Sequence, residues 1–246
     1  KPIPVIDTLE YVIKFYKDIY VSETPNKEIN KWLTHCFEKS SIKPPTYAKK
    51  DYQVVLKFLY GHRGSDDTFS SYRRELERLI QWSWFVRNKS LWSLKRDDIE
   101  AFIEFCIKPP KRWITLKKHP RFRTINGERV PTPEWALFEA QISKIDRKKG
   151  QLPTKSDFKL SQSAIKVMFS ILSSFYNYLI QEELAPSNPV APMRQKSKFL
   201  QKNTQNVIRR LSNRQWEMVL SLAQEKALKD VNHERTVFIL SCLFYM

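Results

Sequence analysis

The apolar residues of this chain recur at spacings of three and four, which is the pattern of amphipathic helices. The clearest stretch, residues 160–181, reads LSQSAIKVMFSILSSFYNYLIQ. Ser161 is a typical helix cap at its start, and Pro186 and Pro189 predict that the helix ends before them. One face of this helix carries large apolar side chains and must be buried: Ile165, Met168, Phe169, Leu172, Phe175, Tyr176 and Leu179.

The same spacing predicts further helices before this stretch. Pro44 and Pro45 interrupt the chain between two of them, and Gly61 to Ser65 form a turn before another. The predicted helices cover residues 8–21, 26–40, 46–60, 68–88 and 97–107.

Residues 108–133 break the helical pattern. They contain five prolines and the Asn126-Gly127 pair, and they carry eight basic residues against one acidic residue. This composition predicts a long loop with a small hairpin that turns at Asn126-Gly127. Helical spacing returns over residues 135–148, which predicts that a helix anchors a basic insertion at about 108–155.

Basic residues also dominate the stretch that follows Pro192. We interpret residues 193–211 as an interdomain linker. Ser212 and Gln215 form a capping-box pattern at the start of a helix that continues past Ala223, and residues 235–246 begin another apolar helix.

Composition favours a polyanionic partner for this mostly helical chain. The 246 residues include 43 Lys and Arg against 26 Asp and Glu, a formal net charge of +17. This excess favours nucleic acid over an acidic small molecule. Four glycines are too few for a Gly-rich phosphate loop or a hairpin-rich β fold, so an all-α fold is expected.

The cysteines and histidines do not form a catalytic or metal-binding pattern. Cys36, Cys106 and Cys242 are far apart in the sequence and lie in apolar helical stretches, so we expect a reducing cytoplasm and no disulfide framework. The four histidines have no metal-ligand spacing, and no cofactor or metal is expected. Apolar runs of the roughly 20 residues that span a bilayer are missing, so no membrane partner is expected.

Three segments, taken in order, resemble the core-binding domain of the tyrosine recombinases, the phage integrase family. The first segment resembles it at Thr68, Tyr72, Leu76, Leu79 and Trp82. The second does so at Leu94, Asp97, Asp98, Ile99, Phe102 and Ile103. The third does so at Leu160, Ser161, Ala164, Ile165, Leu172, Phe175, Tyr176, Tyr178, Leu179, Asn188 and Pro189.

The resemblance implies a SAM-like helical core-binding domain over residues 63–192, preceded by an N-terminal helical extension over residues 1–62. Residues 212–246 would then be the first helices of a truncated catalytic domain. The basic insertion at 108–155 departs from the family pattern, which lacks such a long insert.

The family cuts and rejoins DNA through a 3′-phosphotyrosyl intermediate, and the resemblance places the catalytic residues downstream of this chain. We therefore expect no catalytic residue here and a structural role for Tyr176 and Tyr178. The chain alone is expected to bind DNA without cleaving it. The full-length protein is expected to associate with itself on double-stranded DNA and to reside with the nucleoid in the cytoplasm.

The expected DNA contacts lie on two helices and the linker. Ser70, Ser71, Arg73 and Arg74 lie near a helix start, where free N–H groups favour phosphate. The resemblance adds positions near the start of the later helix: Gln162, Ser163 and Lys166. The linker contributes Arg194, Lys196, Lys198, Lys202, Arg209 and Arg210.

The insertion could add nonspecific phosphate contacts, or it could be a flexible basic loop. Its cations are Lys111, Arg112, Lys117, Lys118, Arg121 and Arg123, with Trp113 and Phe122 between them.

Other functions remain open on the sequence alone. The charge and the helices also fit a non-enzymatic helical DNA-binding regulator or architectural protein. RNA binding or attachment to an anionic membrane surface would use the same charge, and a simply solvated charged face would need no partner.

Overall fold

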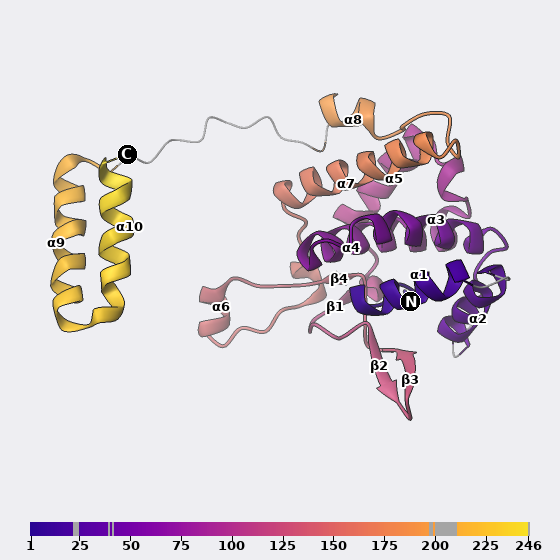
Figure 1. Ribbon diagram of the computed structural model, residues 1–246, viewed down its shortest axis with the longest axis horizontal. Coiled ribbons are helices and arrows are strands. Elements are labelled where there is room, and N and C mark those ends of the chain that lie inside the picture. The colour runs from indigo at the N-terminus through magenta and orange to yellow at the C-terminus, as the bar shows by residue number, and fades with distance from the viewer. Residues whose placement is uncertain (22–24, 39, 41, 197–198, 200–210, 246) are drawn as a thin grey trace. The chain divides into compact units, whose positions relative to one another are not determined.

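The computed structural model describes residues 1–21, 25–38, 40, 42–196, 199 and 211–245, and it is mostly helical, as predicted (Figure 1). The chain divides into two compact units, Lys1–Leu200 and Gln201–Met246. Each unit is described by itself below. None of the helices in the described ranges has both the length and the apolar character needed to cross a bilayer.

Four helices open the first unit, close to where the sequence predicts them. They are α1 (Leu9–Val21), α2 (Pro25–Phe37), α3 (Ala48–Gly61) and α4 (Asp66–Trp82). Helix α3 packs against the other three. Their apolar faces therefore join a single core rather than separate layers.

The extended segment before α1 is threaded into this core. Val5 and Ile6 are fully buried, and their backbone N–H groups donate to Glu77 Oε1 over 2.7 and 3.2 Å. The Val5 carbonyl accepts from Trp32 Nε1 and Tyr52 Oη, over 2.9 and 2.8 Å. The chain start and α4 are therefore joined by hydrogen bonds that replace those lost to water.

Helix α4 is shorter than the predicted helix over residues 68–88. Ser65 caps its start by accepting from Thr68 N, and after Trp82 the chain widens into a π-helical turn, Ser83–Arg87. Asn88 then takes a left-handed conformation, with φ of 53°. The wider turn is compatible with the burial of both Trp82 and Trp84, and the left-handed residue ends the helix.

Helix α5 (Arg96–Ile107) follows a 3-10 turn at Leu91–Ser93. The buried carboxylate of Asp98 accepts from Lys95 N over 2.9 Å and forms ion pairs with Arg87 and Lys89. Asp98 thus starts α5 and fixes the turn that leaves α4.

Residues 108–142 are folded and contain two short strand pairs. Strand β1 (Ile114–Thr115) pairs in parallel with β4 (Phe138–Glu139), and β2 (Phe122–Ile125) pairs antiparallel with β3 (Glu128–Pro131). The β2–β3 turn has positive φ at Asn126 and Gly127, 50° and 82°, which confirms the predicted hairpin.

The prediction of a helix over residues 135–148 is wrong for the first half of that range, which is not helical. Trp135 to Phe138 are all buried, so this run is covered on every side and lies extended rather than presenting one helical face. Ala140 N donates to Thr115 O over 2.9 Å, which continues the pairing with β1. Only α6 (Lys144–Lys148) is helical.

The aromatic residues of the insertion pack into the core of the first unit. The ring centroids of Phe122 and Trp32 are 5.4 Å apart, and those of Trp113 and Phe105 are 4.9 Å apart. The hypothesis of a loose basic loop is therefore wrong for this part of the insertion, because its apolar side chains have been removed from water.

Helix α7 (Gln162–Gln181) follows the prediction closely at its start, where Ser161 Oγ accepts from Ala164 N over 3.1 Å. The helix ends before Pro186, because Glu183 turns left-handed with φ of 56°. The predicted apolar face is buried throughout.

A short helix, α8 (Ala191–Lys196), comes after α7. Asn188 Oδ1 accepts from Val190 N and Ala191 N at its start, while Asn188 Nδ2 donates to Ser173 O on α7 over 3.0 Å. This single side chain therefore attaches α8 to α7.

The second unit is a pair of helices, α9 (Asn213–Lys229) and α10 (Glu234–Tyr245), joined by a 3-10 turn at Val231–His233. The predicted capping box is present, with Ser212 and Gln215 bonding reciprocally. Trp216 and Phe244 contact each other between the helices, with ring centroids 5.8 Å apart.

Candidate nucleic-acid interface

A pocket of about 720 Å³ lies on the first unit, where α4, the insertion and the start of α7 meet. The first turn of α7 contributes Ala164, and Leu160 precedes it. We call this the arginine pocket, because six cationic side chains line it: Arg73, Arg74 and Arg78 from α4, and Lys118, Arg121 and Arg129 from the insertion.

Carboxylates hold four of these arginines in place. Arg129 forms a two-pronged contact with Asp7, over 2.6 and 2.8 Å. Arg74 and Arg78 share Glu75, with Arg78 Nη1 2.9 Å from Glu75 Oε2 and Arg74 Nε 2.7 Å from Oε1. Arg121 is paired with Glu77.

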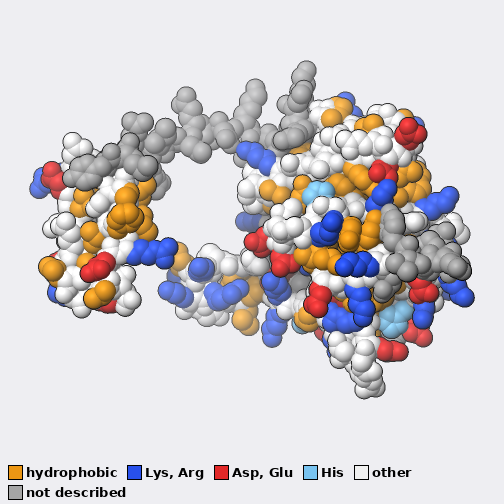
Figure 2. All heavy atoms as spheres, in the orientation of Figure 1, with side chains coloured by type: hydrophobic (Ala, Val, Ile, Leu, Met, Phe, Trp, Pro, Cys, Tyr) orange, Lys and Arg blue, Asp and Glu red, His pale blue; other side chains and the backbone are white. Residues whose placement is uncertain are grey.

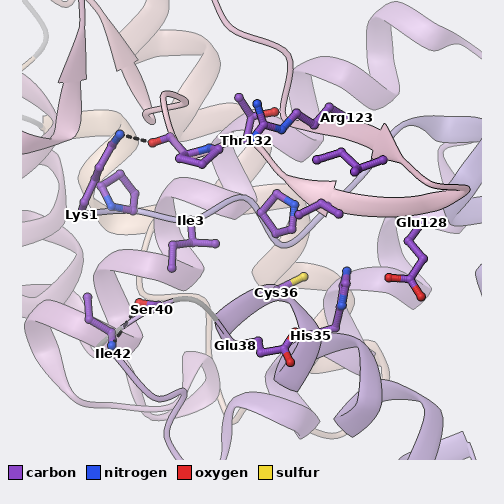
Figure 3. Close-up of a pocket in the computed structure, with 15 residues that line it drawn as sticks. Lys1, Ile3, His35, Cys36, Glu38, Ser40, Ile42, Arg123, Glu128 and Thr132 are labelled. Atoms are coloured by element: carbon purple, nitrogen blue, oxygen red, sulfur yellow. Dashed lines mark hydrogen bonds between the residues drawn. The ribbon is translucent and has the colours of Figure 1, made fainter.

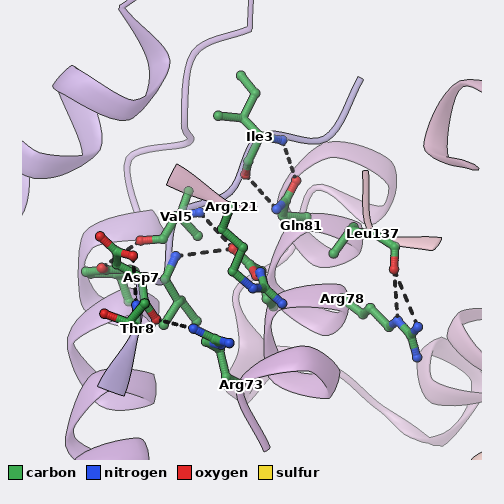
Figure 4. Close-up of polar contacts among 12 residues, drawn as sticks. Ile3, Val5, Asp7, Thr8, Arg73, Arg78, Gln81, Arg121 and Leu137 are labelled. Atoms are coloured by element: carbon green, nitrogen blue, oxygen red, sulfur yellow. Dashed lines mark hydrogen bonds and ion pairs between the residues drawn. The ribbon is translucent and has the colours of Figure 1, made fainter. Parts of the chain in front are cut away.

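Arg121 is one of the insertion cations that the sequence offered for nonspecific phosphate contact. Its guanidinium forms an ion pair with the fully buried Glu77 (Figure 4). It also lies over the Trp135 ring, 4.9 Å from the centroid. Burial lowers the pKa of Arg121 well below its usual value, and the charges of Arg73 and Arg74 lower it further. Arg121 is therefore an internal support of the pocket.

Arg73 is the least satisfied of the pocket arginines. Its Nη1 donates to the backbone carbonyl of Asp7 over 2.6 Å (Figure 4). Its guanidinium lies 5.3 Å from the centroid of the Phe69 ring. Its Nε is buried and has no hydrogen-bond partner among the described residues. Burial lowers the pKa of Arg73, although the charge of Asp7 opposes this change.

The other predicted positions on α4 divide between the pocket and its surroundings. Ser70 is exposed and lines the arginine pocket, whereas Ser71 is half-buried and does not. Arg74 is half exposed, with its Nε on Glu75. The structure therefore brings Ser70, Arg73 and Arg74 together with the start of α7.

The predicted positions on α7 lie beside this pocket and not among its lining residues. Ser163 is exposed and its hydroxyl is 3.0 Å from that of Ser161. Lys166 is exposed, and Gln162 is half-buried. Lys166 is two positions after Ala164, and a helix rotates by about 200° over two residues, so it points away from the pocket.

The linker positions are only partly described. Arg194 and Lys196 lie in α8, but nothing is described of their side chains. The other four fall outside the described residues: Lys198, Lys202, Arg209 and Arg210.

A second cationic region lies in the part of the insertion that sequence analysis did not single out. We call residues 143–159 the cationic loop, because they carry six Lys and Arg against two Asp. Figure 2 shows Lys and Arg side chains gathered over α6, which belongs to this loop. All six cations are exposed: Lys144, Arg147, Lys148, Lys149, Lys155 and Lys159.

The two aspartates of the cationic loop are engaged in local caps. Asp146 Oδ2 accepts from Ser143 Oγ over 2.6 Å, and Asp157 Oδ2 accepts from Thr154 N over 2.7 Å. The latter hydrogen bond lowers the pKa of Asp157. The S-x-x-D and T-x-x-D patterns were readable in the sequence and could have identified this loop.

A smaller pocket of about 450 Å³ lies between α2 and the β2–β3 hairpin (Figure 3). It contains Cys36 and His35, and His35 Nε2 is 2.7 Å from the backbone carbonyl of Arg129. Burial raises the pKa of the Cys36 thiol well above its usual value, and the charge of Asp7 raises it further. The thiol is therefore protonated and unsuited to nucleophilic attack.

Tyr176, which was expected to be structural, is fully buried. Its hydroxyl donates to Leu91 O over 2.9 Å, and burial raises its pKa, followed by the charges of Asp51 and Asp98. A phosphate could not reach this hydroxyl.

Among the described residues, no group of three or more His, Cys, Asp and Glu side chains could hold a metal ion. Comparisons of the chain with protein-family models, with curated proteins and with solved structures found no match.

Proposed function

We propose that this chain binds double-stranded DNA through the cationic loop and the neighbouring face of α4 and α7. The main support for this proposal is the set of six exposed cations in the loop. The loop has only two acidic residues, and both form local helix caps. The loop therefore keeps a clear excess of positive charge that faces water, and a polyphosphate backbone neutralises such cations while releasing its counterions. The loop leads directly into Ser161 and the start of α7, where Ser163 and Lys166 are also exposed.

More specifically, we propose that the chain is the DNA-binding portion of a site-specific tyrosine recombinase, with a SAM-like core-binding domain. The resemblance to that family supports this proposal. So does the packing of the first two segments, where Trp82 contacts Phe102 with ring centroids 5.4 Å apart. Tyr176 of the third segment bonds to Leu91, which lies between the first two. In this proposal the chain supplies DNA binding and not strand cleavage.

The test is a salt titration of binding to a labelled duplex, followed by fluorescence anisotropy. If about six phosphates are neutralised, the slope of log affinity against log salt should be about 5 in magnitude. The double substitution Lys148→Gln and Lys149→Gln should weaken binding and lower the slope by about 2, since each lost phosphate contact removes about 0.9.

A matched control removes two exposed cations near the other end of α7. Lys50 and Arg96 suit this role. Lys50 adjoins Asp51, which bonds to Leu91, and Leu91 in turn bonds to Tyr176 in the second half of α7. The variant with Lys50→Gln and Arg96→Gln should keep the wild-type slope. A flat titration, or equal losses in both double variants, would refute the proposal.

A further inference from the structure

The arginine pocket has more positive charge than its carboxylates can neutralise. Six cations line it, whereas the acidic lining residues are Asp7, Glu75 and Glu139, with Glu77 behind Arg121. Asp7 gives both carboxylate oxygens to Arg129, and Glu75 is divided between Arg74 and Arg78. Arg73 is left with a neutral carbonyl, and Lys118 has no ion pair in the described part of the chain.

These cations also lie close enough to repel one another. Arg73 and Arg74 each disfavour the charged form of Arg121, which shows that the three guanidinium groups share one field. The carboxylates of the pocket offset only part of this repulsion, so an anion that enters the cavity would lower the free energy further.

One hydrogen-bond donor of Arg73 also has no acceptor among the described residues. Arg73 Nε is buried without a partner among the described residues, and a buried unsatisfied donor costs about 1–3 kcal/mol. The Asp7 carbonyl and the Phe69 ring hold the Arg73 guanidinium at the wall of the pocket. An oxyanion in the pocket would offset the uncompensated charge of this guanidinium and part of the repulsion.

We propose that the arginine pocket binds a phosphoryl group, with Arg73, Arg74 and Lys118 as its principal donors. Phosphoryl oxygens suit this set, because each oxygen accepts several hydrogen bonds and guanidinium groups match their geometry. The volume of about 720 Å³ is larger than one phosphate needs and leaves room for the chain or molecule that carries it.

A backbone phosphate of DNA is the first source of that group, and this part of the inference rests on the proposed function. The pocket opens where α4 meets the start of α7, beside the surface proposed to carry the duplex. A free phosphorylated small molecule has the same chemistry and is the second source.

The test uses inorganic pyrophosphate as the probe, at constant ionic strength, with calorimetry on the full chain. Saturable binding is expected. In the double variant Arg74→Gln and Lys118→Gln, the dissociation constant should rise about tenfold or more, because two charge-assisted hydrogen bonds are lost. The side chain of Arg74 is about half exposed, Lys118 is exposed, and Glu75 keeps its ion pair with Arg78. The variant should therefore fold, and circular dichroism checks that it does.

The Lys50→Gln and Arg96→Gln variant again serves as the control and should bind pyrophosphate like the wild type. Absence of saturable pyrophosphate binding, or the same loss in both double variants, overturns the inference. A loss confined to the pocket variant supports it.

Competition between pyrophosphate and labelled duplex separates the two sources. Displacement of DNA by pyrophosphate at constant ionic strength supports a backbone phosphate in the pocket. Binding of both without competition supports a free phosphorylated ligand and overturns the DNA source. Pyrophosphate binding without DNA binding would refute the proposed function and support the phosphoryl site. DNA binding without pyrophosphate binding would support the proposed function and refute the phosphoryl site.

Discussion

Asp51 on α3 has a carboxylate buried against the turn that follows α4, which predicts an unusual pH dependence of stability. Trp84 Nε1 donates to its Oδ2 over 2.8 Å, and Ser90 Oγ and Leu91 N donate to its Oδ1 over 2.6 and 3.2 Å. Burial raises the pKa of Asp51 from 3.8 to about 6, because the loss of water outweighs these three hydrogen bonds.

The magnitude follows from that difference. One pKa unit corresponds to about 1.36 kcal/mol, so a rise of about two units corresponds to about 3 kcal/mol. The folded chain holds this proton more tightly than the unfolded chain does. The contribution of Asp51 to stability is therefore fully present below pH 3.8 and is lost as the pH rises through about 6.

The assay is chemical unfolding of the wild type and of Asp51→Asn at several pH values and one ionic strength. The asparagine cannot titrate, and any hydrogen bond that it loses adds a constant offset. Between about pH 4 and about pH 7, the unfolding free energy of the variant should rise by about 2 kcal/mol relative to the wild type. Asp97→Asn, at an exposed site, is the control for a change of one charge. Parallel curves for Asp51→Asn and wild type, or a change of opposite sign, would show that the reasoning is wrong.

Two further predictions concern single side chains that join distant segments. Glu77→Gln should lower the unfolding free energy by about 3 kcal/mol, because it leaves the buried Arg121 without a counter-charge. Adding Arg121→Gln should recover part of the loss, and simply additive losses in chemical unfolding would contradict the proposed coupling. Asn188→Ala should cost about 1 kcal/mol as a lost cap. The amides of Val190 and Ala191 should then exchange hydrogen faster, and unchanged protection there would argue against that role.

The features that could be predicted were those that depend on a few neighbouring residues. Apolar spacing located most helices, Ser161 and Ser212 marked two helix starts, and Asn126-Gly127 marked the hairpin turn. The failures arose where another segment decides the conformation. Trp135 to Phe138 are not helical, because all four residues are buried and Phe138 begins the strand that pairs with β1, which their own spacing does not reveal.

The candidate site shows the same division. Arg73 and Arg74 were identified from their place near the start of a helix, and they do line a cationic pocket. Nothing local distinguishes Arg121, which is buried against Glu77, from Arg123, which is exposed on the hairpin. The cationic loop was readable as a charge run with two capping patterns, yet only its exposure shows that its cations are available to a partner.

By itself, the sequence determined that this chain is helical, strongly basic and capped at particular residues, because these properties depend on side chains within about four positions of one another. Only the folded structure shows which charged side chains are paired with one another inside the protein. Glu77 bonds to Val5 and Arg121, residues far from it along the chain, and Asp7 holds Arg129, which lies 122 residues later. The energy of such contacts depends on distance in space and on burial, and neither quantity is set by the order of the residues.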